Sequence, residues 1–179
     1  CLQRVEKFWW GETCNYFTES LDLVINDIIL RVFKDQEALA AASVAIFSDF
    51  LKTDGDQTFI VPGGTTPVLF YNYLATERFD WTSVKLIPSD ERLLTEDSEK
   101  SNAGMIRRNL IENINGESNP ELISIVNDND PNETDKIVSS INYRTKHLFP
   151  PRAAFLGVGA DGHTASLFND SKHDIMSGK

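Results

Sequence analysis

Three short segments of the chain hold the residues whose types and spacing could do chemistry. They are Gly63–Thr66, Asp90–Arg92 and Gly157–His163. Together they offer glycines that expose the backbone, an acid–acid–base cluster, and a histidine close to an aspartate. Phosphate binding and general-base catalysis are the kinds of chemistry that these residue types support.

The third segment places Gly157, Gly159 and Gly162 in the spacing GxGxxG, which is also the spacing of a dinucleotide-binding loop. That motif should open the first long helix of a βαβ unit, with an acid on the second strand. Only 17 residues follow Gly162, and no second strand is visible among them. We therefore favour a sharp turn that presents His163 as a general base, with Asp161 orienting its ring. A plain surface histidine is the alternative.

The first segment has the composition of an anion-binding loop. Gly63 and Gly64 allow the backbone to approach a ligand closely. Thr65 and Thr66 offer hydroxyl groups and are expected to cap the next helix, whose N-terminus attracts phosphate. The segment lacks the GK[ST] of an ATPase loop. A glycine turn with a capping threonine explains the same residues without a ligand.

The second segment is a compact charged cluster that follows an apolar run. Arg92 could bind a phosphate or carboxylate, while Asp90 or Glu91 could hold Arg92 in place or contact sugar hydroxyls. A solvated charged loop is the alternative. Ser101 and Asn102 open the next helix with good capping residues.

Apolar runs alternate with segments of helical period along most of the chain. The expected strands are 28–33, 58–61, 81–89, 121–126 and a buried strand at 153–158. The expected helices are 35–52 with Asp35 as N-cap, 67–76, 103–114 and 135–149. This order predicts an α/β fold, a Rossmann-like three-layer domain with a mainly parallel sheet. Sites in such sheets gather at the carboxyl ends of the strands, and all three segments follow a strand.

Composition narrows the class of protein. The 179 residues fit about one domain, with residues 1–27 as an N-terminal extension of unclear role and 28–179 as the main domain. A net charge of −10 argues against non-specific nucleic-acid binding but is compatible with an anionic small substrate. Cys1 and Cys14 lack metal or disulfide-framework spacing, which fits a reducing cytoplasm. No apolar run is long enough for a membrane span, and no ordinary signal peptide is visible.

The three segments, in this order, resemble the 6-phosphogluconolactonase family, which shares its fold with glucosamine-6-phosphate deaminase. The resemblance rests on "GGTTPVLFYNYLA", "WTSVKLIPSDERLL", "SNAGMIRRNL" and above all "FLGVGADGHTASLF". It covers roughly residues 28–168. Family members continue with further strands and another basic residue beyond the length of this chain, so the resemblance implies that C-terminal strands are missing. The family's Ser-Gly-Gly is here Pro62-Gly63-Gly64, and its aspartate before the last matched strand is replaced near Ala153 and Ala154.

The resemblance implies hydrolysis of 6-phosphoglucono-δ-lactone to 6-phosphogluconate in the oxidative pentose phosphate pathway. His163 would be the base and Asp161 its partner, with neither metal nor cofactor required. The expected substrate-binding residues are Gly63, Gly64, Thr65, Thr66, Asp90, Glu91, Arg92, Asn102, Gly159 and Gly162. The expected partner is the phosphorylated sugar lactone, without nucleic acid or membrane, in a cytoplasmic monomer or homodimer.

Two other functions stay open. The first is an amino-sugar phosphate deaminase or isomerase on the same fold. The resemblance would then imply a glutamate five residues after the histidine and a tyrosine at the position of Arg92, whereas this chain has Phe168 and the arginine. The second is a sugar-phosphate-binding domain without catalysis.

Overall fold

The computed structural model describes residues 3–4, 20–25, 28–51, 55–126 and 133–168. Both cysteines, most of the predicted N-terminal extension and most of the predicted loop after residue 126 lie outside them. The chain divides into two compact units, Cys1–Lys52 and Thr53–Lys179. The division falls within the domain predicted to begin at residue 28, and that domain boundary stays a prediction.

Unit 1 combines a small antiparallel sheet with one helix. Its strands β1 (Gln3–Arg4), β2 (Ser20–Ile25) and β3 (Ile28–Phe33) lie in the order β1-β2-β3. Helix α1 (Gln36–Leu51) begins where the sequence predicts, because the Asp35 carboxylate accepts the Ala38 N–H at 2.8 Å.

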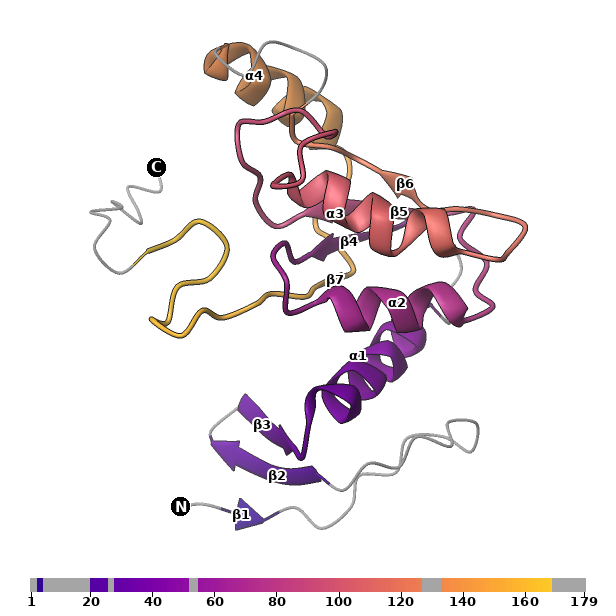
Figure 1. Cartoon of the computed structure of the whole chain (residues 1–179), viewed down its shortest axis with the longest axis vertical. Helices are drawn as coiled ribbons and strands as arrows, with labels where there is room; N and C mark the ends of the chain where they lie inside the picture. Colours follow the sequence, from indigo (N-terminus) through magenta and orange to yellow (C-terminus); the bar gives the residue numbers. More distant parts are fainter. Residues whose placement is uncertain (1–2, 5–19, 26–27, 52–54, 127–132, 169–179) are drawn as a thin grey trace. The chain divides into compact units, whose positions relative to one another are not determined.

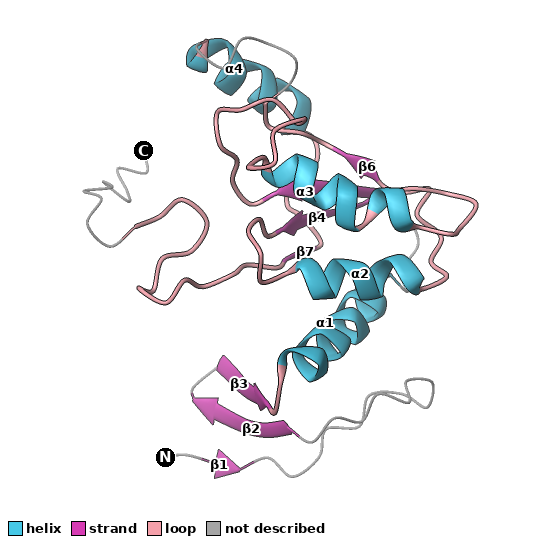
Figure 2. Ribbon diagram, in the orientation of Figure 1, coloured by secondary structure: helices cyan, strands magenta, loops and turns pink. Residues whose placement is uncertain are grey.

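Unit 2 is an α/β arrangement around a four-stranded parallel sheet (Figures 1 and 2). Its strands are β4 (Gln57–Val61), β5 (Val84–Pro88), β6 (Glu121–Leu122) and β7 (Ala153–Ala154). Its helices are α2 (Val68–Thr76), α3 (Asn102–Asn109), a 3₁₀ turn at Ile111–Asn113, and α4 (Thr134–Thr145). The strand order is β6-β5-β4-β7, so the predicted mainly parallel sheet is confirmed in this unit.

The core of unit 2 forms where apolar side chains of the inner strands meet the helices. In β5, Val84, Leu86 and Ile87 are all buried, so neighbouring residues that point to opposite faces of the sheet are both covered. Helices α2 and α3 pack together, and Leu74 and Ile106 are almost fully buried. A sheet covered on both faces matches the predicted three-layer architecture.

Two predicted strands are much shorter than expected. Of residues 121–126 only Glu121–Leu122 form a strand, and of 153–158 only Ala153–Ala154 do. The prediction of a buried strand over 153–158 is wrong, because Leu156 and Val158 are 53% and 74% exposed. Strand β7 ends the sheet order and pairs with β4 alone among the described residues, so nothing there extends the ladder on its outer side. No helix in the described part of the chain is long and apolar enough to cross a membrane.

Candidate functional site

The strand order places the site at the edge where the predicted segments lie. From β4 the chain moves outward to β5 and β6, and then returns to place β7 on the other side of β4. The loops after β4 and β7 therefore flank a point where the strand order reverses, which is where ligands bind in open α/β sheets. We call the segments that follow β4, β5 and β7 the glycine loop (Pro62–Pro67), the charged loop (Ser89–Lys100) and the histidine loop (Phe155–Phe168).

The glycine loop is fixed at its start by a buried phenol. The Tyr71 hydroxyl donates to the Pro62 carbonyl at 2.6 Å, and burial raises the pKa of that phenol. Gly64 has a φ of +84°, a left-handed conformation that favours glycine. At Gly63 a Cβ would collide with the side-chain amide of Asn102. The glycines are therefore required by the turn and by close packing.

The backbone of the glycine loop retains several N–H groups with no acceptor in the described part of the chain. Gly64 N–H donates to Asn102 Oδ1 at 3.3 Å, whereas those of Gly63, Thr65 and Thr66 have no such partner there. Both threonine side chains are exposed. The expectation that they cap α2 is wrong, because Pro67 occupies the N-cap and no side chain bonds the first turn. The threonines thus stay free to meet a ligand.

In the charged loop, Glu91 caps helix α3 through its carboxylate. The carboxylate accepts hydrogen bonds from the N–H groups of Arg92 (2.8 Å), Asn102 (2.7 Å) and Ala103 (2.8 Å) and from the Ser101 hydroxyl (3.0 Å). Ser101 is also the N-cap that the sequence predicts, with its hydroxyl accepting from a further N–H of the first turn. The α3 N-terminus is therefore neutralised by the protein's own carboxylate.

Asn102 connects the glycine loop with the charged loop. Asn102 is 1% exposed. Its Oδ1 accepts from Gly64 N–H and from Arg92 Nη1, the latter at 2.5 Å, and its Nδ2 donates to the Asp90 carbonyl at 2.9 Å. Because the Asn102 side chain is enclosed, it orients the glycine loop and the charged loop. The sequence alone did not distinguish this role from direct substrate binding.

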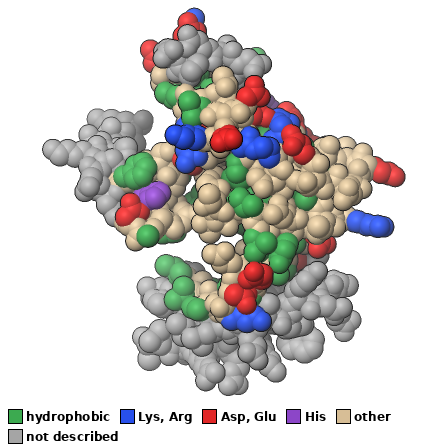
Figure 3. Space-filling model, in the orientation of Figure 1, with side chains coloured by type: hydrophobic (Ala, Val, Ile, Leu, Met, Phe, Trp, Pro, Cys, Tyr) green, Lys and Arg blue, Asp and Glu red, His purple; other side chains and the backbone are tan. Residues whose placement is uncertain are grey.

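Arg92 is exposed and keeps donors for a ligand. Its Nη1 donates to Asn102 Oδ1 and to the Lys100 carbonyl at 3.0 Å. Its Nε and Nη2 have no acceptor within the described ranges. An arginine held by one nitrogen and open at the others can bind an anionic group. Basic and acidic side chains are interspersed on the face drawn in Figure 3. Arg92 is one positive group on a chain with a net charge of −10.

The histidine loop folds on itself around the predicted pair. Asp161 Oδ1 lies 2.5 Å from His163 Nδ1, and this hydrogen bond lowers the pKa of the Asp161 carboxyl group. Gly162, at φ +85°, makes the turn, and a Cβ at Gly159 would collide with the histidine ring. The N–H groups of both glycines are engaged within the loop, at 2.8 and 2.9 Å. Figure 2 shows that the chain from β7 to Phe168 has no regular structure.

The histidine ring is positioned for proton transfer. Asp161 accepts from Nδ1–H in the tautomer that this contact favours, which leaves the Nε2 lone pair as a base. Phe168 packs against the ring with centroids 4.9 Å apart, and the His163 side chain is about one-third exposed. The arrangement can take a proton from water at one nitrogen while a carboxylate supports the charge at the other.

A contact that the sequence did not reveal joins the histidine loop to the charged loop. The Ser166 hydroxyl donates to Asp90 Oδ2 at 2.8 Å across 76 residues of sequence, while Asp90 Oδ1 accepts from Ser89 at 3.1 Å. The contact of Tyr71 with the Pro62 carbonyl, nine residues earlier, was also missed. Neither a serine nor a tyrosine carries a local sequence signal that identifies its hydrogen-bond partner.

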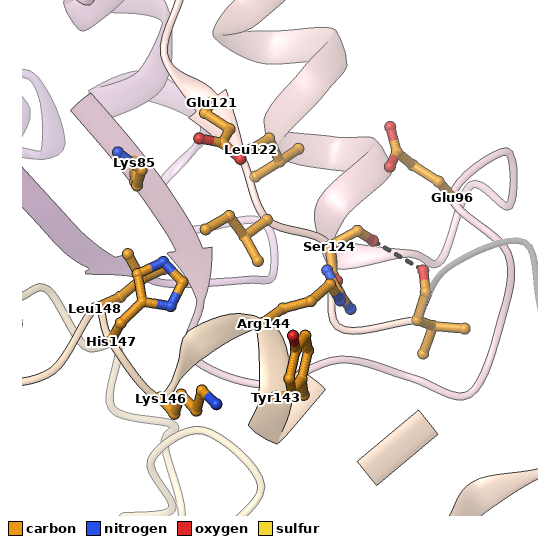
Figure 4. Close-up of a pocket in the computed structure, with 12 residues that line it drawn as sticks. Lys85, Glu96, Glu121, Leu122, Ser124, Tyr143, Arg144, Lys146, His147 and Leu148 are labelled. Atoms are coloured by element: carbon orange, nitrogen blue, oxygen red, sulfur yellow. Dashed lines mark hydrogen bonds between the residues drawn. The ribbon is translucent and has the colours of Figure 1, made fainter. Parts of the chain in front are cut away.

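A pocket of about 790 Å³ lies elsewhere in unit 2, between β5, β6 and the end of α4 (Figure 4). Arg144 points into it and donates to the Ser124 carbonyl at 2.8 Å, and His147 lines it. The glycine and histidine loops do not contribute to it. In the part of the chain that the structure covers, no three His, Cys, Asp or Glu side chains form a group suited to a metal ion.

Comparison with known proteins agrees with this fold. Residues 34–177 match the family model of glucosamine-6-phosphate isomerases/6-phosphogluconolactonase. Since that match covers most of the sequence, the chain belongs to this family.

The chain is also similar to individual 6-phosphogluconolactonases. The chain is 38% identical over 118 residues to a 6-phosphogluconolactonase of Xylella fastidiosa, covering 65% of this chain and 47% of the relative. It is 32% identical over 132 residues to that of Neisseria meningitidis, covering 74% and 56%. The crystal structure of a 6-phosphogluconolactonase from Shewanella baltica superposes with a TM-score of 0.66 at 26% identity, over 75% of this chain and 58% of that one. The chain thus spans about half the length of the curated relatives it matches.

Proposed function

We propose that this chain carries the catalytic loops of a 6-phosphogluconolactonase, an enzyme that hydrolyses 6-phosphoglucono-δ-lactone to 6-phosphogluconate. The observation that carries the proposal is the Asp161–His163 pair, on the loop that flanks the strand-order reversal. The names of the relatives support the same reaction. We place it in the oxidative pentose phosphate pathway of the cytoplasm, with the enzyme a monomer or homodimer.

The chemistry requires a base and little else, because a lactone carbonyl is already electrophilic. Nε2 of His163 takes a proton from water while the water oxygen bonds to the lactone carbonyl carbon, and a tetrahedral oxyanion forms. The oxyanion then collapses and breaks the ring C–O bond. The imidazolium, stabilised by Asp161, returns the proton to the departing ring oxygen, so one water is added overall. General-base catalysis of this kind contributes roughly 10²–10⁴-fold.

The phosphate of the substrate is proposed to bind between the glycine loop and Arg92. The N–H groups of Gly63, Thr65 and Thr66 that lack acceptors among the described residues form one side, and Nε and Nη2 of the arginine the other. Glu91, Asn102, Gly159 and Gly162 were predicted to bind substrate. Their contacts support a different proposal, in which they shape the loops, because their polar groups are engaged inside the protein.

The proposal is tested by adding the purified protein to lactone generated freshly from glucose 6-phosphate. The rate of acid release should exceed the spontaneous rate in proportion to enzyme concentration. A parallel incubation with glucosamine 6-phosphate should release no ammonia, because Phe168 occupies the position at which the deaminase hypothesis requires a glutamate. Ammonia release without lactone hydrolysis would replace the lactonase with the deaminase, and phosphate binding without either reaction would leave a binding domain.

A further inference from the structure

We propose that Asn102, Asp90 and Ser166 form a positioning chain that sets the separation between the phosphate subsite and the base, and so favours a phosphorylated lactone over an unphosphorylated one. The inference rests on the proposed function and deepens it. Its three residues are positioning residues, since the hydrogen bonds that they make in this structure join one loop to another.

The first part of the chain of contacts fixes the phosphate subsite. The buried Asn102 amide accepts from Gly64 N–H and Arg92 Nη1 through one atom, and donates to the Asp90 carbonyl and Oδ1, at 2.9 and 3.4 Å, through the other. Rotating the amide by 180° would set donor against donor and acceptor against acceptor, so the network defines a single orientation. The glycine loop and the arginine are thereby tied to one rigid group.

The second part attaches the histidine loop to that group. Most of the hydrogen bonds that shape the histidine loop are internal, such as Gly159 N–H to the His163 carbonyl at 2.8 Å and the Thr164 hydroxyl to the Gly157 carbonyl at 2.9 Å. Such bonds shape the turn without placing it. The hydrogen bond from Ser166 to Asp90 does place it, because it reaches the charged loop.

The backbone next to Ser166 supports a specific role for this contact. Ala165 has a φ of +50°, which is unusual for a residue with a Cβ. The alanine holds a left-handed turn immediately before the serine, and the turn brings the hydroxyl to Asp90. If the loop only had to turn at this position, glycine would adopt the left-handed conformation with less strain than alanine.

The positioning chain should matter for a substrate that is bound at its phosphate and reacts at its carbonyl. A phosphorylated lactone is held at its phosphate, so its carbonyl meets His163 only if the two subsites keep the correct spacing. An unphosphorylated lactone has no such anchor and gains nothing from that spacing. Loosening the chain should therefore lower the preference for the phosphorylated substrate and leave the basal rate on the other substrate unchanged.

The test compares Ser166→Ala with the wild-type protein on 6-phosphoglucono-δ-lactone and on glucono-δ-lactone. We expect kcat/KM for the phosphorylated lactone to fall about tenfold, mainly through kcat, the scale of one lost hydrogen bond to a charged group. The rate on glucono-δ-lactone should stay within about twofold. Ser166→Thr keeps the hydroxyl and should restore the ratio, and Ser43→Ala, which removes an exposed hydroxyl from α1, should not change it.

Each outcome has a distinct meaning. An equal fall on both substrates would show that Ser166 only stabilises the loop, and unchanged kinetics would show no positioning at all, so either would overturn the inference. A wild-type protein that hydrolyses neither lactone would instead refute the proposed function. In that case the His163 proton resonances should still shift when inorganic phosphate binds the wild type and not when it binds Ser166→Ala, and equal shifts in both would also refute the positioning chain.

Discussion

Replacing Glu91 with glutamine tests whether this carboxylate holds the site together. The change keeps the size of the side chain but leaves one acceptor oxygen where the structure uses two. With the amide oxygen kept on the N–H groups of Arg92 and Asn102, the new NH₂ group faces the Ser101 hydroxyl and the Ala103 N–H. The hydroxyl can accept from it, whereas the Ala103 N–H loses its acceptor. The negative charge at the α3 N-terminus is lost as well.

These contributions give the expected size of the effect. A hydrogen bond to a charged group contributes about 1.5–3 kcal/mol, and a charge at a helix N-terminus about 0.3–1 kcal/mol. We therefore expect Glu91→Gln to lower the free energy of unfolding by about 2–4 kcal/mol, against the roughly 5–15 kcal/mol available to a typical domain. A variant that still folds should also show weaker phosphate binding, because Arg92 and Asn102 both depend on this cap.

Urea unfolding at neutral pH measures the change, with Glu117→Gln as the matched control. Glu117 is exposed and makes no polar contact with the described residues, so its replacement should change the free energy of unfolding by no more than about 0.5 kcal/mol. A loss below about 1 kcal/mol for Glu91→Gln, or a loss equal to that of the control, would refute the cap as the organiser of the charged loop.

Three further contacts are each tested by a substitution. Gly63→Ala should destabilise by about 1–3 kcal/mol in thermal or urea unfolding, because its Cβ meets a buried amide, whereas Gly157→Ala, with open space around it, should be nearly neutral. Tyr71→Phe should cost about 1–3 kcal/mol in the same assay, since it leaves a buried carbonyl without its donor. The pKa of Asp161 is lower in the folded protein than its ordinary value of 3.8. The ionised carboxylate therefore contributes its full stabilisation above pH 3.8 and loses it as the pH falls through the folded-state pKa. In a carbon-detected titration its midpoint should therefore rise in His163→Ala, and an unchanged midpoint would contradict the pairing.

The sequence predicts the parts of this structure that depend on local chemistry. The predicted caps at Asp35 and Ser101 are confirmed. In each, the side-chain oxygen accepts a hydrogen bond from an N–H only three residues away, so the signal is local. The Asp161–His163 contact is equally local, and the glycines around it carry a clear signal. The parallel sheet followed from alternating strands and helices, and with it the expectation that the three segments follow strands at one edge.

The sequence could not supply what depends on distant partners. Helix α2 begins after Pro67, so the threonines that look like caps stay outside it. Nothing near Asn102 indicates that its amide is buried between two loops, and nothing near Ser166 indicates a partner 76 residues earlier. The apolar run at 153–158 matches a buried strand by composition. Ala153 and Ala154 pair with Phe59 and Ile60, however, and β4 ends at Val61, so residues 156–158 lie past the end of the strand that β7 pairs with.

If His163 is the base of a lactone hydrolase, the reaction should depend on its imidazole and not on the other described histidine in unit 2. The rate of hydrolysis of fresh 6-phosphoglucono-δ-lactone would be measured for the wild type, for His163→Ala, and for His147→Ala, whose histidine lies in the separate pocket near α4. We predict a loss of about 10²-fold or more in kcat for His163→Ala, with KM little changed, and wild-type kinetics for His147→Ala. An unaltered kcat in His163→Ala would exclude His163 as the base, because the geometry of the histidine loop would then have no part in the reaction.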